Sequence, residues 1–378
     1  MSYLALYRRY RPNNFNDVIG QEKIIKTLIN QINSDKISHA YLFCGSRGTG
    51  KTSTAKIFAK AINCRNPQNG SPCYECEVCK KQEQSNLDIF EIDAASNNGV
   101  DEIRDLREKV KYPPMNGKYK VYIIDEVHML SPGAFNALLK TLEEPPKHVV
   151  FVLATTEVHK LPATILSRCI RFDFSLVGVK ELSELLVKIL KDNSIEYETE
   201  AINLIARAGE GSVRDMLSIA DMCISYGGNK ISYEDVLKVL GVTKKSEIIS
   251  IAESIFANDL GQAIIKLNKI LETGKSPLLL SKDMIEYFRD LLVICTAKTT
   301  ARNFVVVQDD VFEKMKAQAV SENYFKIIKA IEEFSKIEQE LRYSVLPKLV
   351  LEVALIKTMD ELSLSERVEK LEKTNKGV

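Results

Sequence analysis

Residues 39–52 read HAYLFCGSRGTGKT, an apolar run followed by a glycine-rich loop that ends in lysine and threonine. The run at 40–44 predicts a buried strand, and the apolar spacing at 57–62 predicts a helix directly after the loop. A loop of the form GxxxxGKT between a strand and a helix is typical of a phosphate-binding site. The alternative is an ordinary glycine turn before a helix, and the flanking strand and helix make it the weaker interpretation.

Three glycines let the backbone of this loop adopt conformations in which consecutive N–H groups face phosphate oxygens. The positive end of the following helix dipole lies at the same place. Lys51 would reach the β- and γ-phosphates of a nucleotide, and the Thr52 hydroxyl would ligate Mg²⁺. The predicted nucleotide-binding residues are those of the loop itself: Gly45, Ser46, Arg47, Gly48, Thr49, Gly50, Lys51 and Thr52.

The composition is that of an ordinary globular protein, with 378 residues, 45% of them hydrophobic and 27% charged. This length allows two or three domains. The formal net charge of +1 excludes a polycation, so any binding of nucleic acid would depend on the local placement of charge. Residues 1–11 carry no apolar signal segment and no run is long enough to cross a bilayer, so we expect a cytoplasmic protein.

Eight cysteines in a cytoplasmic chain argue against a disulfide framework. Four of them are scattered among apolar neighbours and are most simply small buried side chains: Cys44, Cys169, Cys223 and Cys295. The other four follow the spacing C-x8-C-x2-C-x2-C, which suits a closed, tetrahedral, structural zinc site. An iron–sulfur cluster is the weaker alternative, because nothing else in the sequence indicates electron transfer. These four predicted ligands are Cys64, Cys73, Cys76 and Cys79.

Strand patterns alternate with helical patterns in the first half of the chain. The predicted strands are 40–44, 87–93, 120–124, 149–154 and 169–174. This alternation predicts an α/β fold with a parallel, doubly wound sheet flanked by helices. Residues 3–18 read as polar and irregular, and the cysteine insert reads as a knuckle of turns without a helix. From about residue 179 the strand signal stops and helical spacing continues to about residue 362.

The strand at 120–124 ends in an acidic pair, Asp125 and Glu126. A nucleotide hydrolase needs such a pair beside its phosphate loop. Asp125 would hold Mg²⁺ through water, and Glu126 would orient and polarise the attacking water. The alternative, an exposed acidic turn, loses weight because the phosphate loop is present. His128 lies just past the pair, and packing is the simpler explanation for it.

Three further positions allow two interpretations each. The fourth strand ends in Ala154-Thr155-Thr156, and a hydroxyl there would hydrogen-bond the γ-phosphate or the attacking water, although threonine is also common at strand ends. Arg168 precedes the last strand, and from the residues alone a solvated arginine is the simpler interpretation. Arg214 starts a helix, and because a cation there opposes the helix dipole it hints at a neighbouring anion.

Together these motifs closely resemble the bacterial DNA polymerase III tau/gamma family, the AAA+ ATPase subunits of the sliding-clamp loader. The resemblance covers residues 1–242, beyond which only helical character and length are similar. It is carried by the four clustered cysteines and by the segments 45–52, 125–130, 135–146, 154–156 and 167–169. It implies an AAA+ P-loop nucleotide-binding module at 1–177 with a zinc-binding insert at 64–79, a small helical lid domain at 178–242, an all-helical collar and oligomerisation domain at 243–364, and a charged tail or linker at 365–378.

The resemblance also implies roles for individual side chains. Asp125 and Glu126 would be the Walker B pair, and Thr155 would be the first sensor. Arg214 would be the second sensor, reaching the nucleotide in its own subunit. Arg168 would be an arginine finger that completes the site of the adjacent subunit, which reverses the interpretation from the residues alone. The residues expected to carry catalysis are then Lys51, Asp125, Glu126, Thr155, Arg168 and Arg214.

The implied cofactors are ATP, Mg²⁺ and structural Zn²⁺. The implied partners are clamp-loader subunits of the delta and delta-prime type, the sliding clamp and primer–template DNA, with no membrane. The family's long form extends well past residue 378 to bind polymerase and helicase, through regions absent here, and it acts at the nucleoid-associated replisome in the cytoplasm. Relatives carry basic, DNA-facing residues where this chain has Asn97, Asn98 and Gly99. Lys140 and Thr164 then become the candidates for contact with DNA.

The expected function is ATP-driven opening of the sliding clamp and its loading on primed DNA. Two alternatives are an assembly scaffold of the replisome that binds ATP only as a structural ligand, and another AAA+ DNA motor such as a branch-migration helicase. The intact Glu126 argues against the scaffold. The cysteine insert and the sequence Ser167-Arg168-Cys169 argue against the other motor.

Overall fold

The computed structural model describes residues 4–84, 87–241, 243–305, 307 and 309–360. They form two compact units, Met1–Val236 and Leu237–Val378. The predicted tail or linker at 365–378 lies outside the described residues. Within the described ranges, no helix combines the length and the apolar character needed to span a membrane.

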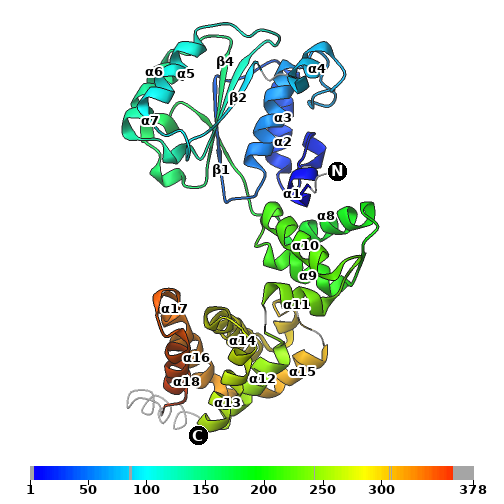
Figure 1. The fold of residues 1–378 in the computed structure, drawn as a ribbon, viewed down its shortest axis with the longest axis vertical. Helices are drawn as coiled ribbons and strands as arrows, with labels where there is room; N and C mark the ends of the chain where they lie inside the picture. The colour runs from blue at the N-terminus through cyan, green and yellow to red at the C-terminus, as the bar shows by residue number, and fades with distance from the viewer. Residues whose placement is uncertain (1–3, 85–86, 242, 306, 308, 361–378) are drawn as a thin grey trace. The chain divides into compact units, whose positions relative to one another are not determined.

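Five parallel strands form the sheet of the first unit, in the order β2-β3-β4-β1-β5 (Figure 1). Their bounds are β1 Ala40–Cys44, β2 Ile89–Asp93, β3 Lys120–Asp125, β4 Val149–Thr155 and β5 Ile170–Asp173. The predicted parallel sheet is thereby confirmed. The central strands β1 and β4 are buried along their whole length, as expected for a parallel sheet that is covered on both faces. Their carboxyl ends and that of β3 meet at one edge of the sheet.

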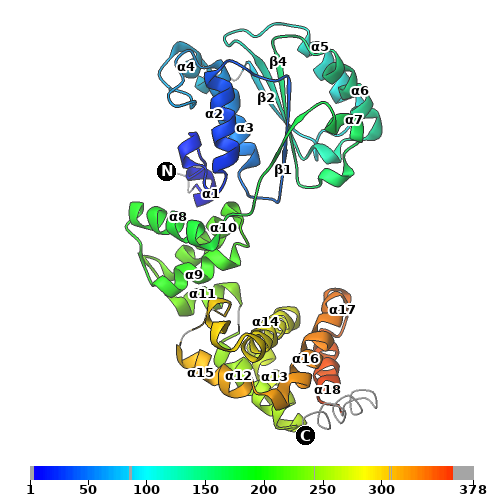
Figure 2. The ribbon, with the colours of Figure 1, turned by 180° about the vertical axis from the view of Figure 1, so that it is seen from behind.

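Helices cover both faces of this sheet (Figures 1 and 2). One face carries α2 and α3, and the ring of Phe58 on α3 packs edge-on against Tyr41 of β1. Leu42, which points the other way, belongs to the core beneath α5, α6 and α7. Helix α6 begins with Ser131 as its N-cap and Pro132 at its first position. The helices are α2 Glu22–Asn33, α3 Lys51–Asn63, α5 Val100–Val110, α6 Pro132–Glu143 and α7 Ala163–Leu166.

Two segments differ from the sequence-based expectation. Residues 3–18 were expected to be irregular, but they contain the short helix α1, Leu6–Arg9, which packs against α10. The cysteine insert was expected to hold no helix, but α4, Glu77–Gln84, begins directly after Cys76. An exposed pair between Lys81 and Glu77, one turn apart, favours that helix.

The remainder of the first unit is mainly helical. It also contains one pair of two-residue strands, β6 Glu196–Tyr197 and β7 Lys230–Ile231, which is too short to leave a periodic pattern in the sequence. Its helices, of which α11 runs past the end of the unit, are α8 Val179–Asp192, α9 Thr199–Ala208, α10 Val213–Gly227 and α11 Tyr233–Leu240.

The described part of the second unit is helical, as predicted. Its core is built around the long helix α14, whose Tyr287 and Phe288 are fully buried. The helices are α12 Lys245–Phe256, α13 Leu260–Glu272, α14 Pro277–Ala297, α15 Asp309–Gln318, α16 Tyr324–Lys336, α17 Glu338–Tyr343 and α18 Pro347–Met359. Short 3-10 segments complete the two units: η1 Phe15–Asp17, η2 Val127–Met129, η3 Val158–Lys160, η4 Lys298–Asn303 and η5 Ser321–Asn323.

Asp88 fixes the loop that leads into β3. Its side chain is buried, and its two carboxylate oxygens accept hydrogen bonds from the backbone N–H groups of Met115 at 2.6 Å, Asn116 at 2.7 Å and Gly117 at 2.8 Å. The carboxylate therefore supplies the hydrogen-bond acceptors for three consecutive backbone N–H groups, as a neighbouring strand would do in a sheet.

We predict that Asp88→Ala lowers the free energy of unfolding by about 2–4 kcal/mol, because three N–H groups lose a charged acceptor together. Urea unfolding followed by circular dichroism measures the change. Asp101→Ala is the matched control, since its carboxylate is 89% exposed and forms an exposed ion pair with Arg104. Equal unfolding midpoints for the two variants would contradict the prediction.

Candidate active site

The phosphate loop lies between β1 and α3, in the context that the sequence predicts. Gly45, Gly48 and Gly50 all have positive φ, and at the first two a side chain would also meet close neighbours. Gly45 has φ +146°, and a Cβ there would lie 2.5 Å from the carbonyl oxygen of Phe174. Gly48 has φ +75°, and a Cβ there would lie 1.9 Å from Ser212 Oγ. A side chain at either position would displace its neighbours and strain the backbone.

Lys51 lies beneath this loop and is only 6% exposed. Its Nζ donates hydrogen bonds to the carbonyl oxygens of Gly45 at 2.7 Å and Ser46 at 2.8 Å. Burial lowers the pKa of Lys51, and the negative charges of Glu126 and Asp125 oppose this shift. A buried ammonium group is stabilised by a nearby anion that compensates for lost hydration. The phosphates of a nucleotide would supply such an anion.

Thr52 joins the loop to the acidic pair. Its hydroxyl donates a hydrogen bond to Asp125 Oδ2 at 2.7 Å. This bond connects the start of α3 to the end of β3, although β4 separates β1 from β3 in the sheet. A hydroxyl and a carboxylate oxygen are the hard ligands that Mg²⁺ prefers. The two groups therefore fit the predicted magnesium position.

Glu126 takes a left-handed backbone conformation, with φ 46° and ψ 46°. Its Oε2 accepts hydrogen bonds from Thr156 N at 3.2 Å and from Thr156 Oγ1 at 3.0 Å. The Nδ1 atom of His128 lies 3.4 Å from the same oxygen. The carboxylate is thus held in place from the end of β4 as well as from its own segment.

Thr155 lies at the end of β4 and is fully buried. Its hydroxyl oxygen accepts a hydrogen bond from the N–H of Glu157 at 3.0 Å and lies 3.0 Å from His128 Nδ1. The hydroxyl that contacts Glu126 is therefore that of Thr156, which the sequence did not single out. His128 is more than a packing residue here, because it lies between Glu126 and Glu157, 3.4 Å from each.

Arg168 lies on the surface of the first unit, in the turn between α7 and β5. Its guanidinium donates hydrogen bonds to Glu143 Oε1 at 2.8 Å and to the carbonyl oxygen of Thr164 at 2.8 Å. It is not among the described residues that line the pocket beside the phosphate loop. The structure thus keeps Arg168 apart from Lys51 and the acidic pair.

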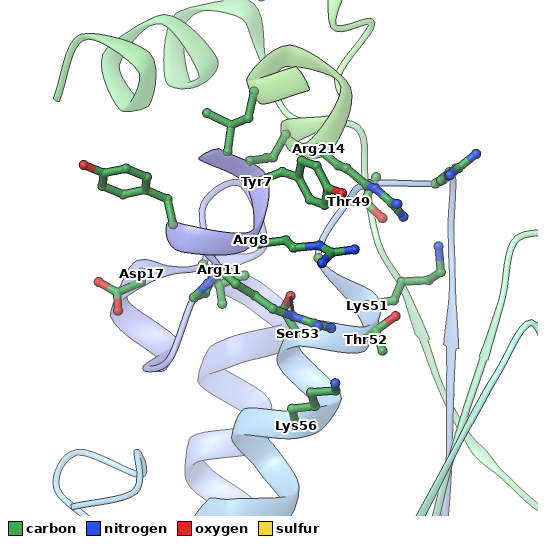
Figure 3. Close-up of a pocket in the computed structure, with 18 of the residues that line it drawn as sticks. Tyr7, Arg8, Arg11, Asp17, Thr49, Lys51, Thr52, Ser53, Lys56 and Arg214 are labelled. Atoms are coloured by element: carbon green, nitrogen blue, oxygen red, sulfur yellow. Dashed lines mark hydrogen bonds between the residues drawn. The ribbon is translucent and has the colours of Figure 1, made fainter. Parts of the chain in front are cut away.

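A pocket of about 720 Å³ opens beside the phosphate loop (Figure 3). Helix α10 approaches the phosphate loop so closely that the N–H of Val213 donates a hydrogen bond to the carbonyl oxygen of Gly48 at 3.1 Å. The next residue, Arg214, lines the pocket. The cationic residues that line this pocket are Arg8, Arg11, Arg47, Lys51, Lys56 and Arg214, and the anionic ones are Asp17, Glu91, Asp125 and Glu126.

The segment at 7–18 forms another wall of this pocket, which the sequence analysis missed. Its lining residues come from α1 and the turns after it: Tyr7, Arg8, Tyr10, Arg11, Pro12, Asp17 and Val18. Arg11 also reaches α3, where its Nε donates to Ser53 Oγ at 3.1 Å. The three arginines near the N-terminus were the available signal, but only the folded chain brings two of them to the pocket.

The four clustered cysteines converge, with their sulfur atoms all within 4.8 Å of one another. The Sγ of Cys64 lies 3.4 Å from that of Cys73 and 4.0 Å from that of Cys76. Four thiolates around one zinc ion at 2.3 Å in tetrahedral geometry would be about 3.8 Å apart. The cluster is therefore compatible with zinc. The insert also packs on the N-terminal segment: Phe15 N donates to Ser71 Oγ at 3.1 Å, and Tyr74 Oη donates to Asn13 O at 2.5 Å.

Backbone N–H groups surround these sulfur atoms. Cys73 N, Cys76 N and Cys79 N each point at the Sγ of another cysteine of the cluster, at 3.4–3.5 Å. Burial raises the pKa of Cys76, but hydrogen bonds from the N–H groups of Cys79 and Arg65 and from the neighbouring thiols outweigh it, and the pKa falls to about 6. Burial raises the pKa of Cys64 and Cys79. A thiol that ionises near neutral pH is suited to start metal binding.

Comparison with known proteins gives three matches to protein-family models along the chain. Residues 20–177 match the model described as DNA polymerase III, delta subunit. Residues 181–229 match the ATPase lid domain of the DNA polymerase III clamp loader subunit. Residues 231–374 match domain III of DNA polymerase III subunits gamma and tau.

Individual relatives agree with these matches. The DNA polymerase III subunit tau of Bacillus subtilis is 47% identical over 359 residues, covering 94% of this chain and 63% of the relative. Subunit gamma of Buchnera aphidicola is 41% identical over 274 residues, covering 72% of this chain and 74% of the relative. Among solved structures, the RuvB branch migration motor of Thermotoga maritima is 21% identical with a TM-score of 0.47, covering 65% of this chain and 79% of RuvB.

A parallel sheet whose phosphate loop is contacted by a helical lid is the architecture of the AAA+ class, and the lid itself matches the ATPase lid model of the clamp loader subunit. Within that class, the chain belongs to the DNA polymerase III tau/gamma family. It spans less than two thirds of the length of the Bacillus subtilis tau subunit.

We predict that Thr156→Val lowers the turnover number for ATP about three- to tenfold, because Glu126 loses the hydroxyl that holds it. The KM should change little, since Thr156 is not among the residues that line the pocket. Steady-state kinetics measures both constants. Thr156→Ser keeps the hydroxyl and is the control. An unchanged turnover number, or an effect on KM alone, would contradict this role.

We further predict that the wild-type chain binds one zinc ion and that Cys76→Ser loses it and becomes sensitive to protease within the insert. Metal analysis of the purified chain and limited proteolysis measure the two effects. Cys295→Ser, which changes a thiol of the second unit, should keep the metal. A wild-type insert that is protease-resistant without any metal would sink the prediction.

Proposed function

We propose that this chain is the ATP-hydrolysing subunit of a bacterial replicative clamp loader, which uses ATP to open the sliding clamp and load it on primed DNA. The observation that carries this proposal is the bond between Thr52 and Asp125. It brings the phosphate loop and the acidic pair together in a chain of the tau/gamma family. A nucleotide bound there would meet a cation, a magnesium position and a general base at one edge of the sheet.

In this proposal Lys51 binds the β- and γ-phosphates, and Thr52 and Asp125 hold Mg²⁺. The metal, when bound, neutralises charge on the phosphates. Glu126 orients the attacking water and accepts its proton. The buried end of β4 supports that role, because Thr155 and Thr156 fix His128 and Glu126 against one another. Thr155 then acts as the first sensor through His128 and the β4 end, and not through a hydroxyl aimed at the phosphate.

Arg214 is proposed to bind the nucleotide from the lid of the same subunit. Its support is the direct contact between Val213 and Gly48, which brings the start of α10 to the phosphate loop. The positive charge of an arginine on the lid attracts the phosphates of the nucleotide. Because the helix already holds the arginine in place, this electrostatic attraction requires little reorganisation.

Arg168 is proposed to complete the nucleotide site of an adjacent subunit. Arg168 is not among the residues that line the chain's own pocket, and its side chain is 31% exposed, which supports action in trans. In the isolated chain Glu143 occupies it. Docking of a neighbour would then exchange an exposed ion pair, worth little, for a phosphate contact.

Assembly with other clamp-loader subunits, with the clamp and with DNA is part of the same proposal. The second unit supports it with a group of exposed apolar side chains at the end of α17, in the turn that follows it and on α18, including Tyr343 at 87% and Val345 at 93% exposure. Such a group is unusual on a protein that acts alone. Lys140 and Thr164 are both exposed and remain the proposed DNA contacts. The proposed site of action is the replisome at the nucleoid, in the cytoplasm.

The test is steady-state ATP hydrolysis by the chain alone and with delta-type and delta-prime-type subunits, clamp and primed DNA. We expect strong stimulation only in the complete mixture, and none with Lys51→Ala. Arg168→Ala should keep ATP binding but lose at least about tenfold of the stimulated rate, since an arginine that completes a phosphoryl-transfer site contributes this much or more. Arg171→Ala, an arginine three residues away that pairs with Asp173, is the control.

Two results would contradict the proposal. A rate of ATP hydrolysis that does not change when clamp and DNA are added would favour an assembly scaffold or another AAA+ motor. Full stimulation of Arg168→Ala would show that the arginine does not act between subunits.

A further inference from the structure

The N-terminal segment is attached to the lid at several points. The backbone N–H of Leu6 donates to Asp221 Oδ2 of α10 at 2.7 Å. Arg9 Nη1 donates to Asn193 Oδ1 at 2.8 Å, and Asn193 Nδ2 donates to Tyr10 Oη at 2.6 Å. The four side chains that take part in these contacts all belong to residues outside the phosphate loop: Arg9, Tyr10, Asn193 and Asp221. Helix α1 is therefore fixed on the lid.

Tyr7 extends from this fixed helix toward the start of α10. The guanidinium carbon of Arg214 lies 5.2 Å from the centre of the Tyr7 ring, and that of Arg8 lies 5.8 Å from it. Figure 3 shows the Tyr7 ring beside the Arg214 side chain, with Lys51 deeper in the pocket. Both distances are within the range of a cation–π interaction.

The cation–π contact matters because the Arg214 guanidinium has no other strong partner in the described part of the chain. Among the described residues, the Arg214 side chain forms no hydrogen bond or ion pair, and Arg214 is exposed. The pocket that it lines also contains the cations Arg8, Arg47 and Lys51. It also contains the anions Asp17, Glu91, Asp125 and Glu126, so charge alone does not fix one position of the exposed Arg214 side chain. The negative face of the Tyr7 ring attracts the guanidinium and favours the position at the pocket wall.

We propose that Tyr7 is a positioning residue for Arg214. The ring holds the guanidinium at the pocket wall before nucleotide arrives, so that less side-chain freedom is lost on binding. This inference rests on the proposed role of Arg214 in nucleotide binding. It adds a residue that acts through Arg214 and that no sequence motif marks.

The experiment measures the dissociation constant for ATP of the full 378-residue chain and its variants, with a fluorescent ATP analogue as the probe. Tyr7→Leu should weaken binding about two- to fivefold, the effect of losing one exposed cation–π contact. Tyr7→Phe keeps the ring and should bind like the wild type. In the Arg214→Ala background, Tyr7→Leu should cause no further loss, because there is then no guanidinium to hold.

Asn193→Ala is the matched control. It removes the contacts of Arg9 and Tyr10 with the lid, but Asn193 is not among the residues that line the pocket. It should leave ATP affinity within twofold of the wild type, which separates a specific effect of the Tyr7 ring from loosening of α1. Thermal unfolding of each variant checks that the fold is intact.

The outcomes separate the inference from the proposal beneath it. If Arg214→Ala binds ATP as well as the wild type, the proposed role of Arg214 is wrong. If Arg214→Ala binds weakly but Tyr7→Leu binds normally, the inference alone is wrong. The inference is also overturned if Tyr7→Phe loses as much as Tyr7→Leu, or if Tyr7→Leu weakens binding equally with and without Arg214.

Discussion

The hydrogen bond from Thr52 to Asp125 is the interaction on which the rest of the site depends. It joins two residues that are 73 positions apart in the chain. The order β3-β4-β1 makes it possible, because parallel strands deliver the loop after β1 and the acidic pair after β3 to one edge of the sheet. Every other group of the site, including Glu126 and the end of β4, is placed relative to this bond. A sheet with another strand order would leave the same motifs apart.

Contact between backbones sets the second constraint. Ser212 and Val213 lie so close to Gly48 that no side chain fits between them. The glycine thus serves the lid as much as the nucleotide, since a Cβ would push α10 away from the loop. This explains how a lid residue such as Arg214 reaches the pocket without a long connecting segment. It also makes the geometry of the phosphate loop sensitive to the position of the lid.

The sequence was sufficient for the parts of the site that are local in the chain. The phosphate loop and the acidic pair each occupy a few consecutive residues, and the four cysteines all lie within residues 64–79. Their sequence motifs therefore identify them. Helical and strand periodicity likewise predicted the sheet and the helical second unit. The periodicity of each strand and helix is a property of near neighbours in sequence, which pattern reading captures.

Features that depend on tertiary contacts were not predictable. Helix α1 has four residues and gains its stability from α10, to which Leu6 is bound through Asp221. The choice between Thr155 and Thr156 depends on which hydroxyl turns toward Glu126, and spacing cannot decide between adjacent residues. The pocket wall formed by Tyr7 and Arg11 depends on where α1 folds.

The cysteine insert has a consequence that extends beyond its own fold. Its Ser71 and Tyr74 form hydrogen bonds with Phe15 and Asn13, which lie within the segment 7–18 that forms a wall of the pocket. If a metal orders the insert, that order reaches the segment against which a nucleotide would bind. Metal and nucleotide are then thermodynamically linked ligands, and each changes the affinity of the other by the same factor.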